Sequence, residues 1–511
     1  MSQLGDPSPG SAPAPTGGES PSDKPAEVPL WTIIVAGVVA LALVALAGLM
    51  ILRPPGRHTG AVGPLPTTTP SYPAAWNPRI KPIADKAASL RGLSFVHPVP
   101  VRFLPPATFE KTLGADQGQT SKKDRAELRH FTGLLRALGL LAGDVDLQKA
   151  VSDFQGGAVL AYYSFKDEKI TVRGKKITPA IRATLIHELT HVLQDQNFHV
   201  GDELKQLDQQ SDKDPTTSAG TVLQALIEGD AERVRYAYQA ALPPAQRRAL
   251  AAAQTREATE AQGRIADVPP LVVSELSSPY VLGPGLAQAA FDNGGNNAVD
   301  QLFREPPTHE TALFDPFSVV TGKSLVTKVP VPSLQPGEKS FESGELGVLT
   351  WYYLLAERLP LTQALSAAAG WGGDAYVGFD RGATTCTRMS FAGRTPADTA
   401  RMATALQQWA VATPGEQTVT AKGRLVDVAS CDPGTAVPAA EDHSADAMTL
   451  LATRTAITLG VSKGGLPLAA ARCVTDRLVN TFTLPQLNDP SFGRDDPAIQ
   501  AQIAQLAASC R

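Results

Sequence analysis

Hydrophobic and polar positions divide the first part of the chain into three stretches of different character. Residues 1–29 are rich in Pro, Ser, Gly and Ala, and such a segment buries too little apolar surface to offset the entropy lost on ordering, so we expect a disordered tail. Residues 30–52 are apolar and uncharged, and at about 1.5 Å per residue they can cross the roughly 30 Å hydrocarbon core of a bilayer. This run predicts a transmembrane helix that contacts the lipid bilayer. Residues 53–82 are again rich in Pro, Gly and Thr and predict a semi-extended stalk.

A cleaved signal peptide is the alternative explanation of residues 30–52. The run is longer than the apolar region of a signal peptide, it follows a long polar tail, and no clear small-x-small site ends it. A retained single span is therefore the prediction.

Three short stretches have the pattern of β-strands. Residues 99–104 alternate between apolar and polar positions, and residues 157–165 and 169–173 are rich in apolar, aromatic and β-branched side chains. A short polar turn separates the second stretch from the third. These two stretches therefore predict a hairpin.

Longer stretches have helical spacing. Residues 127–141 and 217–241 are apolar at that spacing, residues 343–369 are mostly helical, and a last helix is expected from about Asp496. The fold class predicted from these patterns is α+β and mainly helical, with only a small sheet.

Composition and charge narrow the domain organisation and the choice of partners. The chain has 511 residues, which is too long for one ordinary core, and we divide the folded part into a domain of residues 83–384 and a C-terminal domain of residues 385–511. The formal net charge is −4. Because no basic excess is present to displace counterions from phosphates, we do not expect a nucleic-acid partner.

The four cysteines all lie in the C-terminal domain. An even number confined to one region predicts two disulfides, and of the three possible pairings we favour the sequential one, Cys386 with Cys431 and Cys473 with Cys510. Four buried free thiols are the alternative. The cysteines lack the paired short spacings of a zinc cluster.

The orientation of the span is indicated by two opposed signals. Arg53 and Arg57 follow the span whereas only Lys24 precedes it, which favours a cytoplasmic C-terminal part. The positive-inside rule weakens when a long domain follows, and disulfides require an oxidising compartment. We therefore expect a single-pass protein of the cell membrane whose folded part lies outside the cytoplasm.

The strongest chemical signal lies in a helix predicted from Thr178 to about Asn197. Thr178 is a favourable N-cap, and Pro179 is favourable at the first helical position. The sequence His187-Glu-Leu-Thr-His191 follows, and positions i and i+4 of a helix lie one turn apart on the same face, so that both imidazoles can bind one metal ion. Glu188 would then be the general base for the attacking water.

The remaining positions of this helix fall into two opposite sectors. Its apolar sector, which we expect to pack on a core, contains Ile181, Leu185, Leu189 and Val192. Its other sector, which we expect to line a cleft, contains Thr184, His187, His191 and Asp195.

A catalytic zinc ion (Zn2+) needs a third protein ligand and one open position. Gln194 and Asn197 stand where the metzincin continuation has Gly and His, so we expect an acidic ligand from another helix. Glu228 is the favoured ligand, and Asp230 and Glu232 are its alternatives. A solvated acidic helix face is the other explanation of these three residues.

Two further residues are assigned supporting roles behind the ligands. Glu228 and Glu232 are one turn apart, so that one can bind the metal while the other hydrogen-bonds the free nitrogen of a ligand histidine. Glu232 and Asp195 are the candidates for such a role. Gly229 allows a neighbouring helix to approach closely.

The pattern of HExxH followed by a glutamate on a second helix resembles the gluzincins, the thermolysin-like zinc peptidases. The longer stretches HELTHVLQDQ (187–196) and LIEGDA (226–231) resemble a largely uncharacterised set of bacterial metallopeptidases, and residues 278–280, 306–310 and 368–374 add looser matches. The resemblance covers about residues 90 to 420.

The resemblance implies a zincin-like domain in which His187, His191 and Glu228 bind zinc and Glu188 is the general base. It also implies a substrate-lining edge strand, for which residues 158–165 are the candidate.

Two departures from the thermolysin-like pattern stand out. The gap between the second histidine and the glutamate is longer here, so residues 198–218 are expected to form an extra loop. His309 stands where a small hydroxyl residue is expected. An oxyanion stabiliser is also expected, and the sequence does not choose among Tyr162, Tyr163, Tyr236, Tyr280 and His309.

These features together predict a membrane-anchored zinc metallopeptidase that hydrolyses peptide bonds of a protein or peptide substrate. A cell-envelope binding or scaffold protein that keeps a structural zinc site is the first alternative, and hydrolysis of a non-peptide bond is the second. The intact Glu188 favours hydrolysis, because a structural site could dispense with it. Residues 385–511 carry no chemical motif, and we expect them to dock or present the substrate.

Overall fold

A computed structural model describes residues 72–116, 122–211, 217–322, 326–437, 442–494 and 496–510. The predicted tail (1–29), the predicted span (30–52) and most of the predicted stalk lie outside these residues. Across the described ranges, no helix combines the length and the apolar character needed to cross a bilayer. The first described helix is α2 (Lys81–Arg91), which begins close to the predicted start of the folded part.

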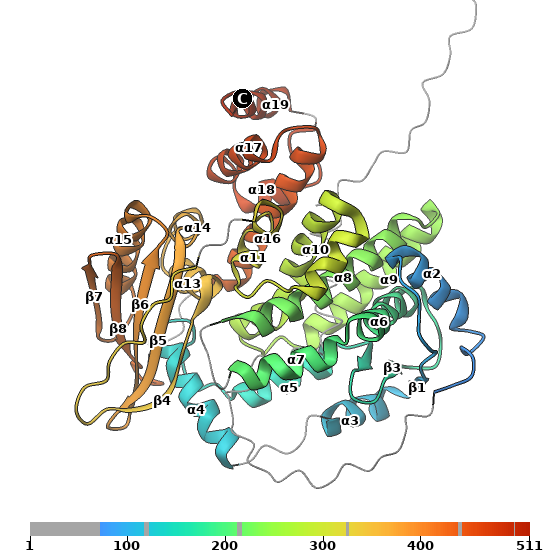
Figure 1. The fold of residues 1–511 in the computed structure, drawn as a ribbon, viewed down its shortest axis with the longest axis horizontal. Helices are drawn as coiled ribbons and strands as arrows, with labels where there is room; N and C mark the ends of the chain where they lie inside the picture. The colour runs from blue at the N-terminus through green and yellow to red at the C-terminus, as the bar shows by residue number, and fades with distance from the viewer. Residues whose placement is uncertain are drawn as a thin grey trace, which may run out of the picture.

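A three-stranded sheet lies at one edge of the helical part of the molecule (Figure 1). Its order is β1 (Val101–Leu104), β3 (Lys169–Arg173) and β2 (Ala161–Ser164). Strands β1 and β3 are parallel, whereas β2 and β3 are antiparallel, which confirms the predicted hairpin.

The predicted start of the hairpin at residue 157 is wrong. Gly157 and Ala158 form the end of α5 (Leu147–Ala158), whose N-cap Asp146 accepts a hydrogen bond from the backbone of Lys149. A short apolar run fits the end of a buried helix as well as it fits a strand, so periodicity could not locate this boundary. The edge strand is therefore shorter than the predicted 158–165.

Three helices form the centre of the helical part: α6 (Pro179–Phe198), α8 (Ala219–Ala240) and α10 (Pro270–Arg304). Helix α8 packs against α6 on one side and against α10 on the other. The remaining helices around them are α3 (Pro106–Asp116), α4 (Lys122–Ala137), α7 (Val200–Ser211), α9 (Pro244–Arg264), α11 (Thr311–Phe314) and α12 (Ser318–Thr321).

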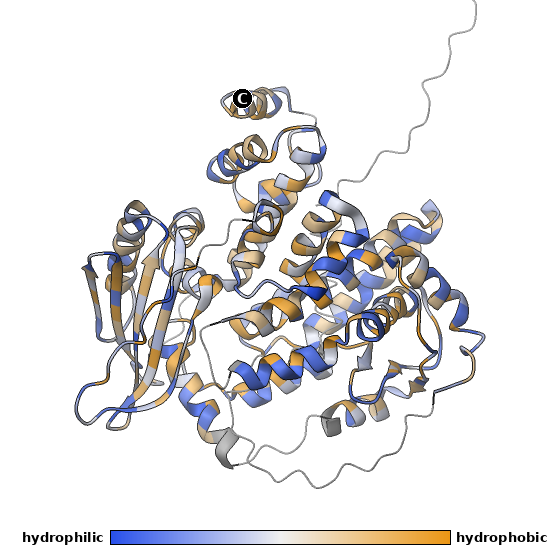
Figure 2. Cartoon of the chain, viewed as in Figure 1, coloured by the Kyte–Doolittle hydropathy of each residue, from blue (hydrophilic) through white to orange (hydrophobic). Residues whose placement is uncertain are grey.

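The extra loop predicted for residues 198–218 is wrong for most of its length. Residues Val200–Ser211 form helix α7, which Figure 2 shows as largely hydrophilic. Its buried residues Val200 and Leu204 pack into the same hydrophobic cluster as α8. Polar residues predominate in this segment, so its composition resembles that of a loop. The four-residue spacing of Val200 and Leu204, however, is the spacing of a helix.

A five-stranded antiparallel sheet lies on the opposite side of the molecule (Figure 1). Its order is β4 (Lys339–Gly344), β5 (Trp371–Arg381), β6 (Thr384–Gly393), β8 (Leu425–Cys431) and β7 (Gln417–Lys422). Helices α13 (Gly347–Ala356) and α14 (Leu361–Ala368) occupy the segment 343–369 that was predicted to be mostly helical, and α15 (Pro396–Ala412) packs on the sheet. The sheet takes strands from both sides of the domain boundary predicted at 384/385.

The chain ends in helices α16 (Ser444–Lys463), α17 (Leu468–Thr481), α18 (Leu484–Asn488) and α19 (Pro497–Ala508). Two disulfides join Cys386 to Cys431 and Cys473 to Cys510, which confirms the sequential pairing. The first connects directly opposed residues of β6 and β8. The observed fold is mainly helical, as predicted, but it has two small sheets where the sequence analysis predicted one.

Candidate metal centre

Helix α6 begins where the sequence predicts. The side chain of Thr178 accepts a hydrogen bond from the backbone of Ile181 at 3.2 Å, and Pro179 occupies the first turn. The helix ends at His199, whose left-handed backbone (φ 54°) closes the last turn. These two ends place the HExxH sequence in the middle of a regular helix, where its side chains have fixed directions.

His187, His191 and Glu228 come together around one point. Nε2 of His187 lies 2.9 Å from Nε2 of His191 and 3.1 Å from Oε2 of Glu228, and Nε2 of His191 lies 3.3 Å from the same oxygen. All three residues are buried. This group of two imidazoles and one carboxylate can bind a metal ion.

The geometry of the group fits a zinc ion. Two ligands of a tetrahedral zinc ion at about 2.0–2.1 Å are roughly 3.3 Å apart. The three separations, 2.9, 3.1 and 3.3 Å, are at this value or slightly below it. Two histidines and one glutamate are also a donor set that catalytic zinc sites use.

Glu232, one turn beyond Glu228, lies behind His187. Its Oε1 is 3.0 Å from Nδ1 of His187, and its carboxylate also pairs with Arg235. Burial alone would raise the pKa of Glu232, but Arg235 and His187 lower this pKa to about 2. A carboxylate only accepts hydrogen bonds, so its closeness favours the tautomer with the hydrogen on Nδ1, which leaves the lone pair of Nε2 for a metal.

Asp230, the other alternative to Glu228, points away from the histidines. Its carboxylate accepts hydrogen bonds from Arg91 at 2.6 Å and from Arg233 at 2.8 Å. These two partners show that Asp230 belongs to a buried ion-pair network between α2 and α8.

The charges around His187 favour its protonated form. Burial disfavours the imidazolium form, but hydrogen bonds with Glu228 and Glu232 raise the pKa of His187 to about 10. The pKa of Glu228 is about 2, because the two histidines outweigh the effect of its burial. The site therefore favours a positive charge between these side chains.

Glu188 lies beside the three ligands and is held by the edge strand. Its Oε2 accepts a hydrogen bond from the backbone N–H of Tyr163 in β2 at 2.8 Å. Burial raises the pKa of Glu188, and the neighbouring His187 and His191 partly oppose this effect. A carboxyl group whose pKa is raised is better suited to accept a proton.

The supporting role predicted for Asp195 is not what the structure shows. Asp195 accepts hydrogen bonds from the hydroxyl of Tyr163 at 2.9 Å and from the backbone of Gly201 at 3.2 Å. The side chain that contacts His191 is Gln194, whose Oε1 lies 2.9 Å from Nδ1. Gln194 and Asp195 are consecutive residues of α6, so their side chains point in directions that differ by about 100° around the helix axis.

Gln224 is a second polar contact that the sequence reasoning missed. Its amide donates to Oε1 of Glu228 at 3.1 Å, so the carboxylate oxygen that does not face the histidines is also hydrogen-bonded. Gln224 precedes Glu228 by one helical turn. Position i−4 on the same helix was the signal that could have identified it.

One half of the two-faced character predicted for α6 is confirmed, because its apolar sector packs on a core, whereas the sector predicted to line a cleft is largely buried as well. Both predicted sectors are buried: Leu185, Leu189 and Val192 are fully buried, and His187 and His191 expose 0% and 6% of their surface. The apolar sector is covered by α2 and the three-stranded sheet, and the other sector is covered by α8. The sequence pattern could not show this, because the side chains that cover the histidines are charged residues of another helix.

The five candidates for an oxyanion stabiliser are placed differently by the structure. The ring of Tyr280 lies 6.3 Å from that of His187, so Tyr280 is near the metal group. The Tyr163 hydroxyl donates to Asp195, and Tyr162 packs edge-on against Phe109. The guanidinium of Arg235 lies over the ring of Tyr236, and Nδ1 of His309 lies 3.1 Å from the carboxylate of Glu345.

Two of the downstream motifs meet at the start of α13. Asp374 accepts hydrogen bonds from the backbones of Leu346 and Gly347 at 2.7 and 3.1 Å, and Glu310 accepts one from Leu349 at 3.2 Å. Carboxylates at a helix N-terminus satisfy free N–H groups and interact favourably with the helix dipole. These motifs therefore have a structural role in the fold.

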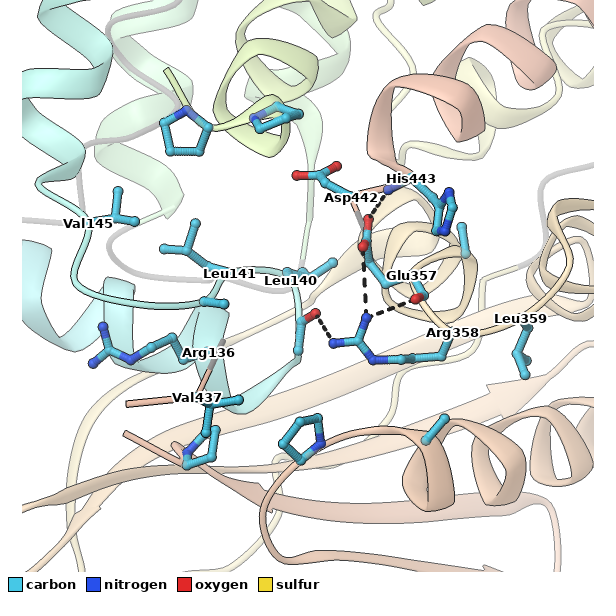
Figure 3. Close-up of a pocket in the computed structure, with 18 of the residues that line it drawn as sticks. Arg136, Leu140, Leu141, Val145, Glu357, Arg358, Leu359, Val437, Asp442 and His443 are labelled. Carbon is cyan, nitrogen blue, oxygen red and sulfur yellow. Dashed lines mark hydrogen bonds and ion pairs between the residues drawn. The ribbon is translucent and has the colours of Figure 1, made fainter. Parts of the chain in front are cut away.

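A large cavity of about 1050 Å³, drawn in Figure 3, is lined by residues that do not belong to the metal group. The residues that line it come from the loop after α4, the α13–α14 connection and the start of α16, and include Leu140, Leu141 and Leu359. Its charged groups are engaged within the protein: Arg358 donates to Gly139 at 3.0 Å, and Glu357 accepts from the backbone of His443 at 3.1 Å. This cavity does not belong to the candidate metal centre.

Comparisons with known proteins add no assignment: no family model, no curated protein and no solved structure matches the chain.

Proposed function

We propose that the protein is a zinc-dependent metallopeptidase. The observation that carries the proposal is the meeting of Glu228 from α8 with His187 and His191 from α6, at 3.1 and 3.3 Å, next to a buried Glu188. Two imidazoles and a carboxylate are the donor set of a metal-assisted hydrolase. The acid next to His187 in the sequence, Glu188, stands where such an enzyme has its general base. The likeness of the two motifs to the gluzincins points to the same chemistry.

His187, His191 and Glu228 would hold a zinc ion, which would supply a Lewis acid to polarise the substrate carbonyl and lower the pKa of water. Glu188 takes the proton of the attacking water on its carboxylate and passes it to the leaving amine. The backbone N–H of Tyr163 holds Oε2 of Glu188, which leaves Oε1 to exchange the proton. Glu232 holds His187 from behind, so that the ligand keeps its direction during the reaction.

Strand β2 is the part of the fold that best suits a peptide substrate. It is the terminal strand of the three-stranded sheet and lies against α6. An extended peptide binds to such an edge by main-chain hydrogen bonds. The backbone of Tyr163 in this strand already contacts Glu188, so a peptide along β2 would lie beside the general base.

The experiment compares the purified full-length protein with Glu188→Gln, which keeps the size of the side chain and its hydrogen bond from Tyr163. Zinc content is measured by elemental analysis, and peptide cleavage with an unstructured protein such as casein. We expect about one zinc per chain in both proteins and a loss of cleavage of at least about 100-fold in the variant. Glu260→Gln, an exposed position of α9, is the matched control and should retain full activity.

Two results would contradict the proposal. Equal cleavage by the wild type and Glu188→Gln would remove the general base from the mechanism. A wild-type protein that binds zinc but cleaves neither proteins nor peptides would favour a structural zinc site.

We also propose that the metal centre works outside the cytoplasm, attached to the membrane through residues 30–52. The two disulfides support an oxidising compartment. Protease treatment of intact cells tests the orientation: digestion of the folded part without cell lysis is expected, and complete protection would contradict it.

A further inference from the structure

Gln194 lies behind His191 and links the two helices of the metal group. Its Oε1 lies 2.9 Å from Nδ1 of His191. Its amide nitrogen donates to the backbone oxygen of Ile227 at 2.9 Å and to Oδ2 of Asp230 at 3.1 Å. Gln194, Ile227 and Asp230 are completely buried, so water does not compete for these contacts.

The two acceptors of Ile227 and Asp230 determine the orientation of the Gln194 amide. A backbone carbonyl and a carboxylate can only accept hydrogen bonds, so the NH2 group must face them and the amide oxygen must face the imidazole. Because this oxygen also only accepts, Nδ1 of His191 must carry the hydrogen. The lone pair of the ring is then on Nε2, the atom that faces His187 and Glu228.

Asp230 is itself fixed by two cations. It accepts from Nε of Arg91 at 2.6 Å and from Arg233 at 2.8 Å, and the side chain of Arg91 is completely buried. A continuous series of contacts therefore runs from Arg91 in α2 through Asp230 and Gln194 to His191. Removing any member leaves the next one with a buried polar group that has lost its partner.

We propose that Gln194 is a positioning residue for the metal, which keeps the Nε2 lone pair of His191 directed at the ion and is itself held by Asp230 and Arg91. This inference rests on the metal binding of the proposed function. It assigns the two ligand histidines different supports, a carboxylate for His187 and a neutral amide for His191. The amide fixes the ring without adding a further negative charge beside Glu188 and Glu228.

The test is the zinc affinity of the full-length protein, measured by competition with a chromogenic chelator. Gln194→Met keeps the length of the side chain and removes the acceptor for Nδ1, and we expect its zinc affinity to fall by about 10- to 100-fold. Thr190→Val is the matched control, because Thr190 is equally buried in α6 and its hydroxyl donates to the backbone oxygen of Ile186 in the same helix. Its zinc affinity should equal that of the wild type.

A second pair of variants separates positioning from general stability. Gln194→Glu still accepts from Nδ1 but places its carboxylate against Asp230, so we expect weak zinc binding. Combining it with Asp230→Asn exchanges the acid and the amide at constant net charge and removes this repulsion, but it also weakens the contacts with Arg91 and Arg233. The zinc affinity of the double variant should therefore rise above that of Gln194→Glu without reaching that of the wild type. The visible spectrum of bound cobalt(II) should change in Gln194→Met and move back toward that of the wild type in the double variant.

Wild-type zinc affinity and an unchanged cobalt spectrum in Gln194→Met would overturn the inference. If Gln194→Met does not fold, equal affinities of Gln194→Glu and the double variant would overturn it instead. Failure of the wild type to cleave peptides would contradict the proposed function alone, because the affinities are measured without a substrate.

Discussion

Gly229 in α8 and Gly283 in α10 touch through their backbones. A Cβ atom added to Gly229 would lie 2.1 Å from the carbonyl carbon of Gly283 and 2.2 Å from its oxygen. The sequence analysis expected Gly229 to admit a neighbouring helix, and α10 is that helix. Gly229 follows Glu228 directly, so the closeness of the two helices also determines where this ligand stands.

Gly229→Ala should destabilise the protein and weaken zinc binding, because backbone atoms of α10 cannot move as a flexible side chain can. Overpacking of this kind costs about 3 kcal/mol or more. Denaturant unfolding and zinc competition measure the two effects. Gly220→Ala is the control: the same helix has open space there, so this variant should be as stable as the wild type or up to about 1 kcal/mol more stable. Equal behaviour of the two variants would contradict the packing argument.

Zinc binding should release about one proton at pH 7. The pKa of His187 is about 10 in the metal-free protein, so its ring is protonated at this pH and must lose the proton to bind a metal. Calorimetric titrations with zinc in two buffers of different ionisation enthalpy measure the released protons. Absence of a buffer dependence would mean that His187 is neutral before zinc arrives.

The same raised pKa predicts how the stability of the metal-free protein depends on pH. An unfolded histidine has a pKa of about 6.5, so the stabilising contribution of protonated His187 is complete below that pH and is lost as pH rises through about 10. The melting temperature of the metal-free protein should therefore fall between pH 7 and pH 10. The zinc-bound protein, in which the ring is already neutral, should show a smaller decline.

Glu275→Gln should stabilise the protein above pH 7. Burial raises the pKa of Glu275 from 4.5 to about 7, so the folded state favours the neutral acid, and this contribution is present below pH 4.5 and lost as pH rises through 7. Gln mimics the neutral form, so the variant should gain about 3 kcal/mol at pH 8 and almost nothing at pH 4. Chemical denaturation at both pH values measures this, with the exposed Glu260→Gln as the control. An equal gain at the two pH values would show that charge is not the cause.

Replacing Cys386 and Cys431 by Ala should lower stability by up to about 4 kcal/mol, the chain-entropy estimate for a loop of this length, since 45 residues separate the two cysteines. Neither cysteine contacts the metal group, so zinc content should not change. Unfolding curves of the double variant and the wild type, recorded without reductant, measure the loss. Loss of zinc together with the disulfide would show that the two regions are coupled.

Local signals predicted the parts of the site that lie within one helical turn. The Thr178–Pro179 start, the two histidines and the one-turn spacing of Glu228 and Glu232 each depend on neighbours in sequence, and the structure shows them as predicted. The exchange of Asp195 for Gln194 could not be predicted in this way. It depends on which side chain faces α8, and the rotation of α6 about its own axis is fixed by tertiary packing.

The errors in the fold have two different causes. Residues 157 and 158 belong to a helix because the chain before them is helical from Leu147, which a short apolar run cannot reveal. Residues 200–211 are helical because Val200 and Leu204 pack on a core. In the second place, secondary structure depended on a partner that is distant in the sequence.

The contacts of α8 have a consequence for the order in which the protein is made. Helix α8 packs mainly on α6 and α10, and its smaller contacts are with α2, α7 and α11, all of which end by Phe314. The helices that hold Glu228 against His187 and His191 are therefore synthesised before most of the five-stranded sheet and before the C-terminal helices. We expect the metal group to be able to form while the rest of the chain is still being added.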